Sequence, residues 1–391
     1  MKTIYIDNSA TTPVRKEVLN EALPYFSKIY GNPSSFHQTG LIAKQAINKS
    51  RKTIGKILNC NENEIIFTGS GTESINLAIK GIAFRELLKN NGLAKGHFIT
   101  QKTEHDAVLE SFEWIRKLGF DVSYINVDKN GLVNLNELKQ TIRSDTLLVS
   151  IMYANNEVGT IQPLQQISKI CHAKNTLFHT DACQGAEYLN LDVKKLGVDM
   201  LTLNGSKIYA FKGSGLLYLK NGIKIEPLIH GGGHENKMRA GTENTPAIVA
   251  IAKALKLAKE EKQKETLRLT KLRDYMIKKI QKEIPKTKLN GHPTKRLPNN
   301  INFSFYGIEG ESLLLMLNEK GVRVSTGSAC SSQSLDPSHV LMAMGLDHGL
   351  AHSSTRFSLG KFTTKKDIDY TINELTKIVK KLRKISPIWE A

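Results

Sequence analysis

The chain has 391 residues, 40% hydrophobic and 24% charged, a balance that excludes wholesale disorder and fibrous repeats. Its length suits two domains, and no apolar run approaches the roughly 20 residues that a membrane helix needs. Lys and Arg outnumber Asp and Glu by 55 to 37, which gives a formal net charge of +18. The first residues have no signal-peptide or transit-peptide character, so we expect a cytoplasmic protein.

Between residues 60 and about 220, short apolar runs alternate with helical patterns such as Ile75, Ile79 and Ile82. Most of the longer runs are apolar nearly throughout, which is typical of strands covered on both faces. The alternation favours an α/β domain with a mostly parallel, seven-stranded sheet. The predicted strands are residues 65–67, 97–100, 122–127, 146–152, 176–179, 200–203 and 216–219.

A lysine-rich stretch follows, from Lys253 to Lys288, with thirteen Lys or Arg against five Asp or Glu. Leu269, Met276 and Ile280 recur in it at helical spacing, which predicts an amphipathic helix with a basic wet face. It lacks the series of aromatic residues that a single-strand nucleic-acid platform uses. We interpret it as a solvated face and do not expect direct nucleic-acid binding.

Beyond this helix the pattern changes to that of a smaller α+β domain. Ile301, Phe303 and Phe305 alternate with polar residues, which predicts a half-buried strand. A helix at 311–320, a strand at 321–325 and a closing helix at 365–385 complete the expected elements. We therefore expect a large domain of residues 15–261 and a small domain made of residues 1–14 together with 262–391.

Four cysteines, at positions 60, 171, 183 and 330, have neither a CxxC pair nor metal-finger spacing. This excludes a disulfide framework and a structural zinc site, and favours a reducing compartment. Cys60 and Cys171 accompany apolar helical patterns and are interpreted as packing residues, and Cys183 lies near a strand end. Cys330 lies in a Ser- and Gly-rich segment (about 325–337) that we expect to move, as a sulfur-transferring nucleophile must.

Three features at predicted strand ends belong together chemically. Residues 67–74 join a strand to a helix through two glycines and several hydroxyls, a setting that favours a phosphate but is weak evidence alone. Asp181 ends one strand, and Lys207 follows another. A phosphate cradle, an acid and a lysine at the carboxyl ends of parallel strands are what pyridoxal phosphate requires, the acid for its ring nitrogen and the lysine for a Schiff base.

The sequence closely resembles the class I cysteine desulfurases of the NifS/IscS type, in the class-V aminotransferase group of fold-type I pyridoxal-phosphate enzymes. The resemblance runs nearly end to end and implies that fold, with pyridoxal 5′-phosphate as cofactor and a homodimer. Its motifs are residues 5–13, 31–35, 103–105, 155–157, 231–234, 239–243, 325–330 and 351–360.

The resemblance also implies roles for single residues. Lys207 matches the lysine that holds the cofactor and moves protons at the substrate Cα, and Cys330 matches the catalytic nucleophile. His105 matches the imidazole that stacks on the cofactor ring and acts in acid–base steps, although a His can equally begin a helix. Asp181 matches the partner of the ring nitrogen, and Gln184 the donor to the 3′ oxygen.

Further matches concern the phosphate and the substrate. Gly71 and Thr72 correspond to phosphate-binding positions, and Thr242 to a phosphate ligand supplied by the other subunit. Asn156 is similar to an amide that contacts cofactor and substrate, and Arg356 to the arginine that grips the substrate carboxylate, for which its planar donor pair is suited. The remaining expected cofactor contacts are Asn204, Gly205 and Ser206.

The sequence departs from the family pattern beside the lysine. Ser206 stands where the family commonly has His, and Asn204 where it often has Ser. A serine hydroxyl gives a shorter and uncharged hydrogen bond, so we expect weaker phosphate binding there.

The implied activity is removal of sulfur from L-cysteine, which gives L-alanine and a persulfide on Cys330. A nearby imidazole such as His105 would favour the reactive thiolate. The sulfur would pass to an iron–sulfur scaffold protein or to a tRNA-thiolating acceptor, and the sequence leaves both open. No resident metal is expected, although Cys330 is a candidate transient ligand of an iron–sulfur cluster.

Two alternatives remain at this stage. An aminotransferase or selenocysteine lyase could use the same scaffold, but transamination has no use for a thiol in a moving segment. A degenerate relative could act as a basic RNA- or protein-binding scaffold. Intact Lys207, Asp181, His105 and Cys330 argue against this scaffold, while the +18 charge and Ser206 keep it open.

Overall fold

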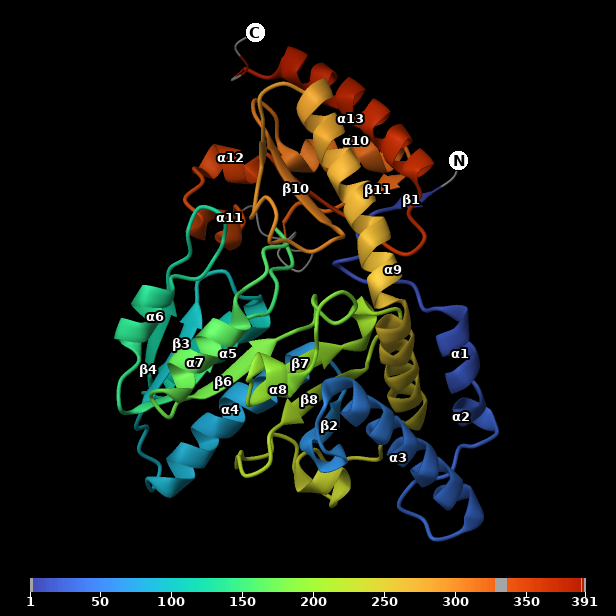
Figure 1. Cartoon of the computed structure of the whole chain (residues 1–391), viewed down its shortest axis with the longest axis vertical. Helices are drawn as coiled ribbons and strands as arrows, with labels where there is room; N and C mark the ends of the chain where they lie inside the picture. Colours follow the sequence, from blue (N-terminus) through green and yellow to red (C-terminus); the bar gives the residue numbers. More distant parts are fainter. Residues whose placement is uncertain (1–2, 328–335, 388, 390–391) are drawn as a thin grey trace.

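The computed structural model describes residues 3–327, 336–387 and 389, and a seven-stranded sheet forms its base (Figure 1). Strand order is β2-β8-β7-β6-β5-β3-β4. β8 runs antiparallel to β2 and β7, and the other neighbours are parallel, which confirms the predicted sheet and its seven strands. The strands are β2 (Ile65–Thr68), β3 (His97–Gln101), β4 (Asp121–Ile125), β5 (Thr146–Ser150), β6 (Leu177–Asp181), β7 (Met200–Asn204) and β8 (Gly215–Leu219).

Helices cover both faces of this sheet, which explains why its strands are apolar nearly throughout. Adjacent strand residues pack into different clusters: Leu148 with Ile79 and Phe112 on one face, Val149 with Ile54 and Ile167 on the other. The helices are α1 (Lys16–Ala22), α2 (Pro24–Ser27), α3 (Gln38–Leu58), α4 (Gly71–Lys89), α5 (Asp106–Lys117), α6 (Leu135–Thr141), α7 (Leu164–His172) and α8 (Val193–Leu196).

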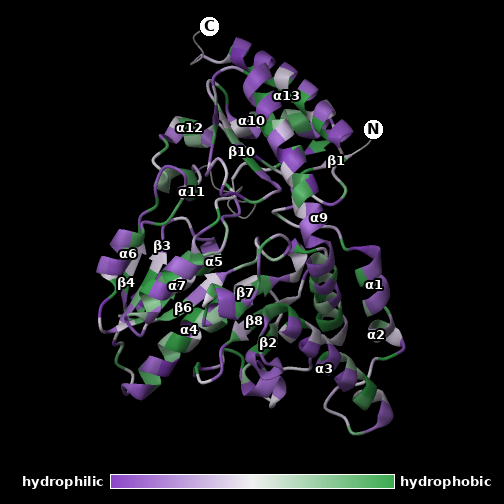
Figure 2. Cartoon of the chain, viewed as in Figure 1, coloured by the Kyte–Doolittle hydropathy of each residue, from purple (hydrophilic) through white to green (hydrophobic). Residues whose placement is uncertain are grey.

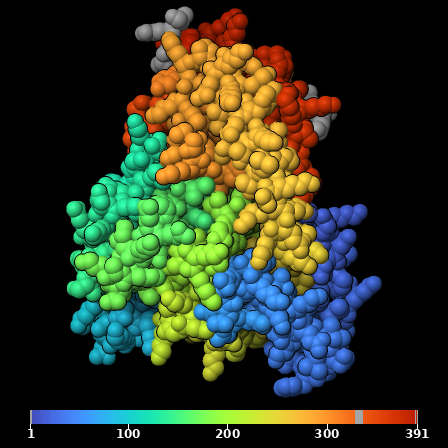
Figure 3. All heavy atoms as spheres, in the orientation of Figure 1, coloured from blue at the N-terminus to red at the C-terminus, as the bar shows by residue number. Residues whose placement is uncertain are grey.

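The C-terminal part stacks on this base, as the orange and red atoms of Figure 3 show. It contains the antiparallel sheet β12-β10-β9 and the parallel pair of β1 with β11, so the N-terminus joins this part. The predicted helices near 311–320 and at 365–385 are confirmed. The elements are β1 (Ile4–Tyr5), β9 (Thr287–Leu289), β10 (Asn300–Phe305), α10 (Gly310–Glu319), β11 (Val322–Arg323), α11 (His339–Ala343), α12 (His348–His352), β12 (Ser354–Ser358) and α13 (Lys365–Ile385).

Strand β10 corrects one expectation, because all six of its residues are buried rather than every second one. Its apolar side chains, such as Phe303 and Phe305, lie in the hydrophobic core of the C-terminal part, which we call the upper core. On the other side, the amides of Asn300 and Asn302 each donate to the backbone carbonyl of Glu157 at 3.2 Å. The polar face of the strand therefore packs against the base and not against water. An alternating sequence pattern looks the same in both cases, so it could not predict this.

The lysine-rich stretch, residues 253–288, begins within α9 (Thr245–Glu283), a helix of 39 residues that runs through both parts (Figure 1), and it extends past the end of that helix into β9. The first half of α9 packs through residues such as Ile251 into the core of the base, and its second half through residues such as Met276 into the upper core. Hydrophilic and hydrophobic residues both occur along α9 and α13 (Figure 2), and Leu269, Met276 and Ile280 are buried, which confirms the amphipathic helix as far as residue 283. The change of core supports our proposal that the domain boundary lies near residue 261.

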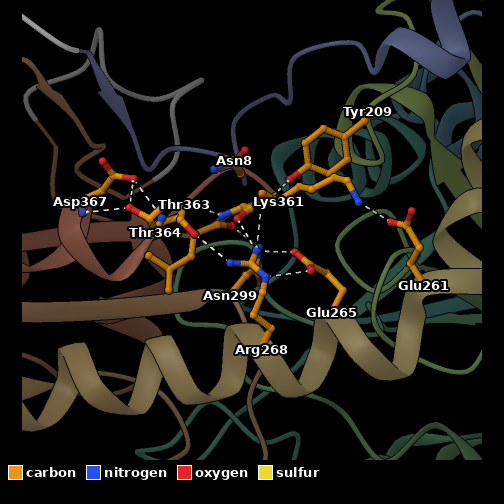
Figure 4. A network of polar contacts seen from close by, with 12 residues as sticks. Asn8, Tyr209, Glu261, Glu265, Arg268, Asn299, Lys361, Thr363, Thr364 and Asp367 are labelled. Atoms are coloured by element: carbon orange, nitrogen blue, oxygen red, sulfur yellow. Dashed lines mark hydrogen bonds and ion pairs between the residues drawn. The ribbon is translucent and has the colours of Figure 1, made fainter.

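A polar network joins the two parts at this point of α9 (Figure 4). The Arg268 guanidinium donates to the carbonyls of Gly360 and Thr363 at 2.9 and 2.8 Å. The Lys361 backbone N–H donates to the Tyr209 hydroxyl at 2.7 Å, and Lys361 Nζ pairs with Glu261. This network ties the loop after β12 to the segment that follows β7.

Candidate active site

A cavity with about 750 Å³ of empty space, including its open mouth, lies where β6 and β7 end. Parallel strands present their carboxyl ends at one edge, where the turns that follow them meet. Nine of the residues expected from the sequence line this cavity: Gly71, Thr72, His105, Asn156, Asp181, Gln184, Asn204, Lys207 and Arg356. Five other residues complete its wall: Ser9, Ala10, Ile75, Met152 and Cys183.

Four expected residues are not among the lining residues. Gly205 and Ser206 lie in the turn beside Lys207, and Thr242 is exposed. Cys330 lies outside the described residues. The roles of these four toward a cofactor or substrate stay predictions, as do those of the nine residues that line the cavity.

One end of the cavity is the start of α4. Ser70 begins this 19-residue helix by accepting the Glu73 N–H at 3.0 Å. A Cβ placed on Gly71 would lie 3.0 Å from Cys183 Sγ and 3.2 Å from Asn204 Cβ, so only glycine leaves this space open. Unpaired N–H groups and the helix dipole make the start of a helix a favourable place for a phosphate.

The turn after β7 decides which side chain faces that space. The Ser206 N–H and hydroxyl both donate to Asn204 Oδ1, each at 3.1 Å. Because Asn204 Oδ1 faces Ser206, Asn204 Nδ2 points away from Ser206. It lies 3.4 Å from where a Cβ on Gly71 would be. Asn204 is therefore the amide donor next to the phosphate space, and the Ser206 hydroxyl serves to orient it.

Lys207 is presented by the same turn, η2 (Gly205–Lys207), and by the N-terminal segment. Its Nζ donates to the Ala10 carbonyl at 2.5 Å. The Thr12 N–H and hydroxyl both donate to the Ser206 carbonyl, at 2.9 and 3.0 Å. The motif at residues 5–13 therefore forms the wall that holds the lysine.

Asp181 ends β6 with little exposure, and its Oδ1 accepts the Cys183 N–H at 2.9 Å. Burial, with the Asp181 charge added to it, raises the pKa of the Cys183 thiol well above its ordinary value. Burial also raises the pKa of Cys60 and of Cys171 to about 12. All three are therefore neutral thiols near pH 7, unsuited to nucleophilic attack.

His105 begins α5, so the ordinary helix-start interpretation and the site interpretation both apply to it. Its Nδ1 accepts the Ala107 N–H at 3.0 Å, which places the proton of the neutral ring on Nε2. The preceding Glu104 is fully buried, and burial raises its pKa well above the ordinary value. Glu104 was not among the residues expected at the site, although it lies within the motif at 103–105.

Arg356 on β12 is only 1% exposed, although it lines the cavity. Its Nη1 donates to the Asn156 carbonyl at 3.1 Å, and its Nη2 pairs with Asp7 at 2.9 Å. Its Nε is buried and has no hydrogen-bond partner among the described residues. A buried guanidinium with a donor to spare is suited to a carboxylate ligand. Asp7 was missed, although it lies in the motif at 5–13.

These residues fit pyridoxal 5′-phosphate by the chemistry of their donors. The open space at Gly71, with the start of α4 and the Asn204 amide, suits the phosphate. Asp181 suits a protonated ring nitrogen, and Lys207 suits a Schiff base. Arg356 remains for the carboxylate of an amino acid.

Residues 3–327, 336–387 and 389 contain no group of three or more His, Cys, Asp or Glu side chains arranged to hold a metal ion. Within the same ranges, no helix combines the length and the apolar character needed to cross a membrane.

Known proteins are similar to this chain over nearly its full length. The family model described as Aminotransferase class-V matches residues 4–371. A protein named Cysteine desulfurase IscS from Methanosarcina thermophila is 52% identical over 387 residues, covering 99% of this chain and 94% of that one. A protein of the same name from Dictyoglomus turgidum is 50% identical over 386 residues, covering 99% and 97%.

Solved structures are similar too. A structure titled NIFS-LIKE PROTEIN has a TM-score of 0.90 and 37% identity, covering 97% of this chain and 100% of that one. Another, titled SspA in complex with cysteine, has a TM-score of 0.81 and 35% identity, covering 93% and 100%. These likenesses agree with the doubly covered, mostly parallel sheet described above.

Proposed function

This chain belongs to the aminotransferase class-V family, and we propose that it is a pyridoxal-phosphate-dependent cysteine desulfurase that releases L-alanine from L-cysteine. One observation carries the proposal: Lys207, Asp181 and Arg356 line a single cavity, beside the open start of α4. An amino acid held by its carboxylate at Arg356 would share this cavity with the lysine. Relatives about half identical to this chain carry the name of that activity.

Several side chains of the cavity have separate tasks in this reaction. When bound, pyridoxal phosphate supplies an electron sink for the negative charge that develops at the substrate Cα. Arg356 binds the substrate carboxylate, and Asp7 and the Asn156 carbonyl keep its guanidinium in place. Lys207 takes the proton from the substrate Cα and returns a proton to carbon. Asp181 keeps the ring nitrogen positively charged.

Sulfur transfer needs a thiolate, and we assign it to Cys330. Its Sγ attacks the sulfur of the substrate, a sulfur–sulfur bond forms, and the carbon–sulfur bond of the substrate breaks with its electron pair left on carbon. One proton then takes the place of the sulfur on Cβ and another returns to Cα, which gives L-alanine and an enzyme persulfide. The raised pKa values of Cys60, Cys171 and Cys183 support this assignment.

The test is incubation of the purified protein with L-cysteine and a thiol reductant, with sulfide, alanine and the visible spectrum recorded together. We expect equal amounts of sulfide and alanine from a yellow protein. Cys330→Ser should form no persulfide or alanine and stay yellow, while Cys60→Ser keeps its activity. Alanine formation by Cys330→Ser at the wild-type rate would show that the assignment of the nucleophile is wrong.

A homodimer with shared sites is the second part of the proposal. Thr242 is exposed and does not line the cavity of its own chain, which supports a role toward the cavity of a partner. Large exposed apolar side chains near α2 and α3, including Phe26, Tyr30 and Phe36, are suited to an interface.

Mixing inactive variants tests this arrangement. If Thr242 acts across the interface, a mixed dimer of Lys207→Ala and Thr242→Ala chains contains one intact site, so activity returns. If Thr242 acts within its own chain, no intact site forms and the mixture stays inactive.

The acceptor of the sulfur is the third part. We propose an iron–sulfur scaffold protein or a tRNA-thiolating protein in the cytoplasm as the recipient, because the resemblance to class I cysteine desulfurases implies these two classes of acceptor. Incubation of the ³⁵S-labelled persulfide enzyme with each kind of acceptor distinguishes them by where the label appears. Label on neither acceptor would oppose this part of the proposal.

A further inference from the structure

Glu157 lies in the loop after β5, next to Asn156 of the cavity wall, and is only 1% exposed. Its backbone N–H donates to Asn155 Oδ1 at 2.9 Å, and its carbonyl accepts the amides of Asn300 and Asn302. The main chain is therefore held from both parts of the molecule. A side chain on such a fixed backbone is a precise anchor for whatever it contacts.

The carboxylate of Glu157 accepts a hydrogen bond from one residue that is distant in sequence and lies close to a second. Its Oε2 accepts the Ser338 hydroxyl at 2.5 Å. A Cβ placed on Gly327 would lie 3.2 Å from the same oxygen and 3.5 Å from Ser338 Cβ. Gly327 also has φ +68°, a conformation that favours glycine. The chain therefore passes this one oxygen at position 327 and again at position 338.

Neighbouring contacts strengthen the second of these anchors. His339 Nε2 donates to the Glu104 carbonyl at 2.9 Å, one residue before His105. Val158 is fully buried in a small cluster with Val340 and Leu341 of α11. The beginning of α11 is thus fixed to the two loops that carry His105 and Asn156.

Positions 327 and 338 flank Cys330, which follows Gly327 by three residues. The described chain therefore borders the Glu157 carboxylate on both sides of the segment that contains Cys330.

We propose that Glu157 is a positioning residue that holds both flanks of the Cys330 segment against the active site and so promotes sulfur transfer to the thiol. It takes no part in the chemistry at the substrate Cα. This inference rests on the proposed desulfurase function. It concerns a residue that is not among those lining the cavity.

Two reactions separate positioning of the thiol from the chemistry at Cα. Exchange of the Cα hydrogen of L-alanine in D₂O, followed by NMR, needs Lys207 and the cofactor but no thiol. Formation of L-alanine from L-cysteine needs both. Alkylation of Cys330 by iodoacetamide, followed by mass spectrometry without substrate, reports on the surroundings of the thiol independently of turnover.

We expect Glu157→Ala to lower alanine formation from L-cysteine by about tenfold, as for a lost hydrogen bond to a charged group, and to leave Cα exchange within about twofold. Its Cys330 alkylation rate should also change. Ser338→Ala, which removes the same hydrogen bond from the other side, should act in the same direction. Glu157→Gln keeps an acceptor and should lose less. Ser312→Ala is the matched control, because it breaks an exposed Ser–Glu bond of 2.7 Å at the start of α10.

Equal losses of exchange and alanine formation would mean that Glu157 acts on the cavity itself, and unchanged alanine formation would mean that it positions nothing; either result overturns the proposal. If Glu157→Ala does not fold, Ser338→Ala still decides. A wild-type protein that exchanges the Cα hydrogen of L-alanine but releases no alanine from L-cysteine would instead refute the proposed function.

Discussion

Arg356 and Asp7 are 349 residues apart in sequence, and their side chains form an ion pair of 2.9 Å beside the cavity. Burial raises the pKa of Asp7, while the Arg356 charge opposes that rise. The pair orients the guanidinium before any substrate arrives. An arginine held in advance binds a carboxylate with a smaller loss of side-chain freedom.

Replacing Arg356 with Lys should therefore impair substrate binding more than turnover. Lysine keeps the charge but not the planar pair of donors, so we expect KM for L-cysteine to rise by about tenfold or more. Steady-state kinetics checks this, with Arg268→Lys as a control at a half-buried arginine that does not line the cavity. A KM unchanged within twofold would argue against carboxylate binding by Arg356.

Gly71→Ala should weaken cofactor binding. The added Cβ would lie 3.0 Å from Cys183 Sγ, in the space assigned to the phosphate. We expect affinity for pyridoxal phosphate to fall by about tenfold, in line with a steric change of one to three kcal/mol. Spectral titration of the cofactor-free protein measures it. Gly349→Ala, where a Cβ meets only Asp347 Oδ1 at 3.5 Å, is the control and should bind normally.

Asn204 and Ser206 should differ in their effect on the same affinity. Asn204 directs its amide to the phosphate space, whereas the Ser206 hydroxyl is bonded to Asn204. Loss of a hydrogen bond to a charged group costs about 1.5–3 kcal/mol, so Asn204→Ala should weaken cofactor binding by at least about tenfold. Ser206→Ala should cost only a few-fold. The reverse order in a spectral titration would show that Ser206 is the direct ligand.

Because of Glu187, the free energy of unfolding should decrease as the pH rises. Burial raises its pKa from 4.5 to about 8, helped by the nearby Glu265 charge and opposed by Lys361 and Arg15. The folded state thus holds a proton that the unfolded state releases above about pH 4.5. This contribution is complete below that pH, and it declines by at most about 1.4 kcal/mol per pH unit up to about pH 8.

Comparison with Glu187→Gln isolates this contribution, because the amide cannot titrate. The difference between the Tm of the variant and that of the wild type should shift in favour of the variant as the pH rises from 5 to 8.5. Parallel pH profiles of the two proteins would mean that Glu187 does not titrate in this range.

The sequence by itself determined the large sheet and the centre of the site. Strand and helix periodicities are local, and they located all seven strands of the sheet. Because the carboxyl ends of parallel strands share one edge, the positions of Asp181 and Lys207 after their strands implied one site, and both line the cavity. The motifs of the resemblance brought in His105, Asn156 and Arg356, which periodicity could not have placed.

Only the tertiary structure decided which groups orient those residues. The pairing of Arg356 with Asp7, the hydrogen bond of Glu157 with Ser338 close to Gly327, and the burial of both faces of β10 join segments that are far apart in the chain. Local periodicity reports whether a residue faces a neighbouring element, but it does not identify that element. Which side chains meet depends on how the C-terminal part packs on the sheet, and that packing is a property of the whole chain.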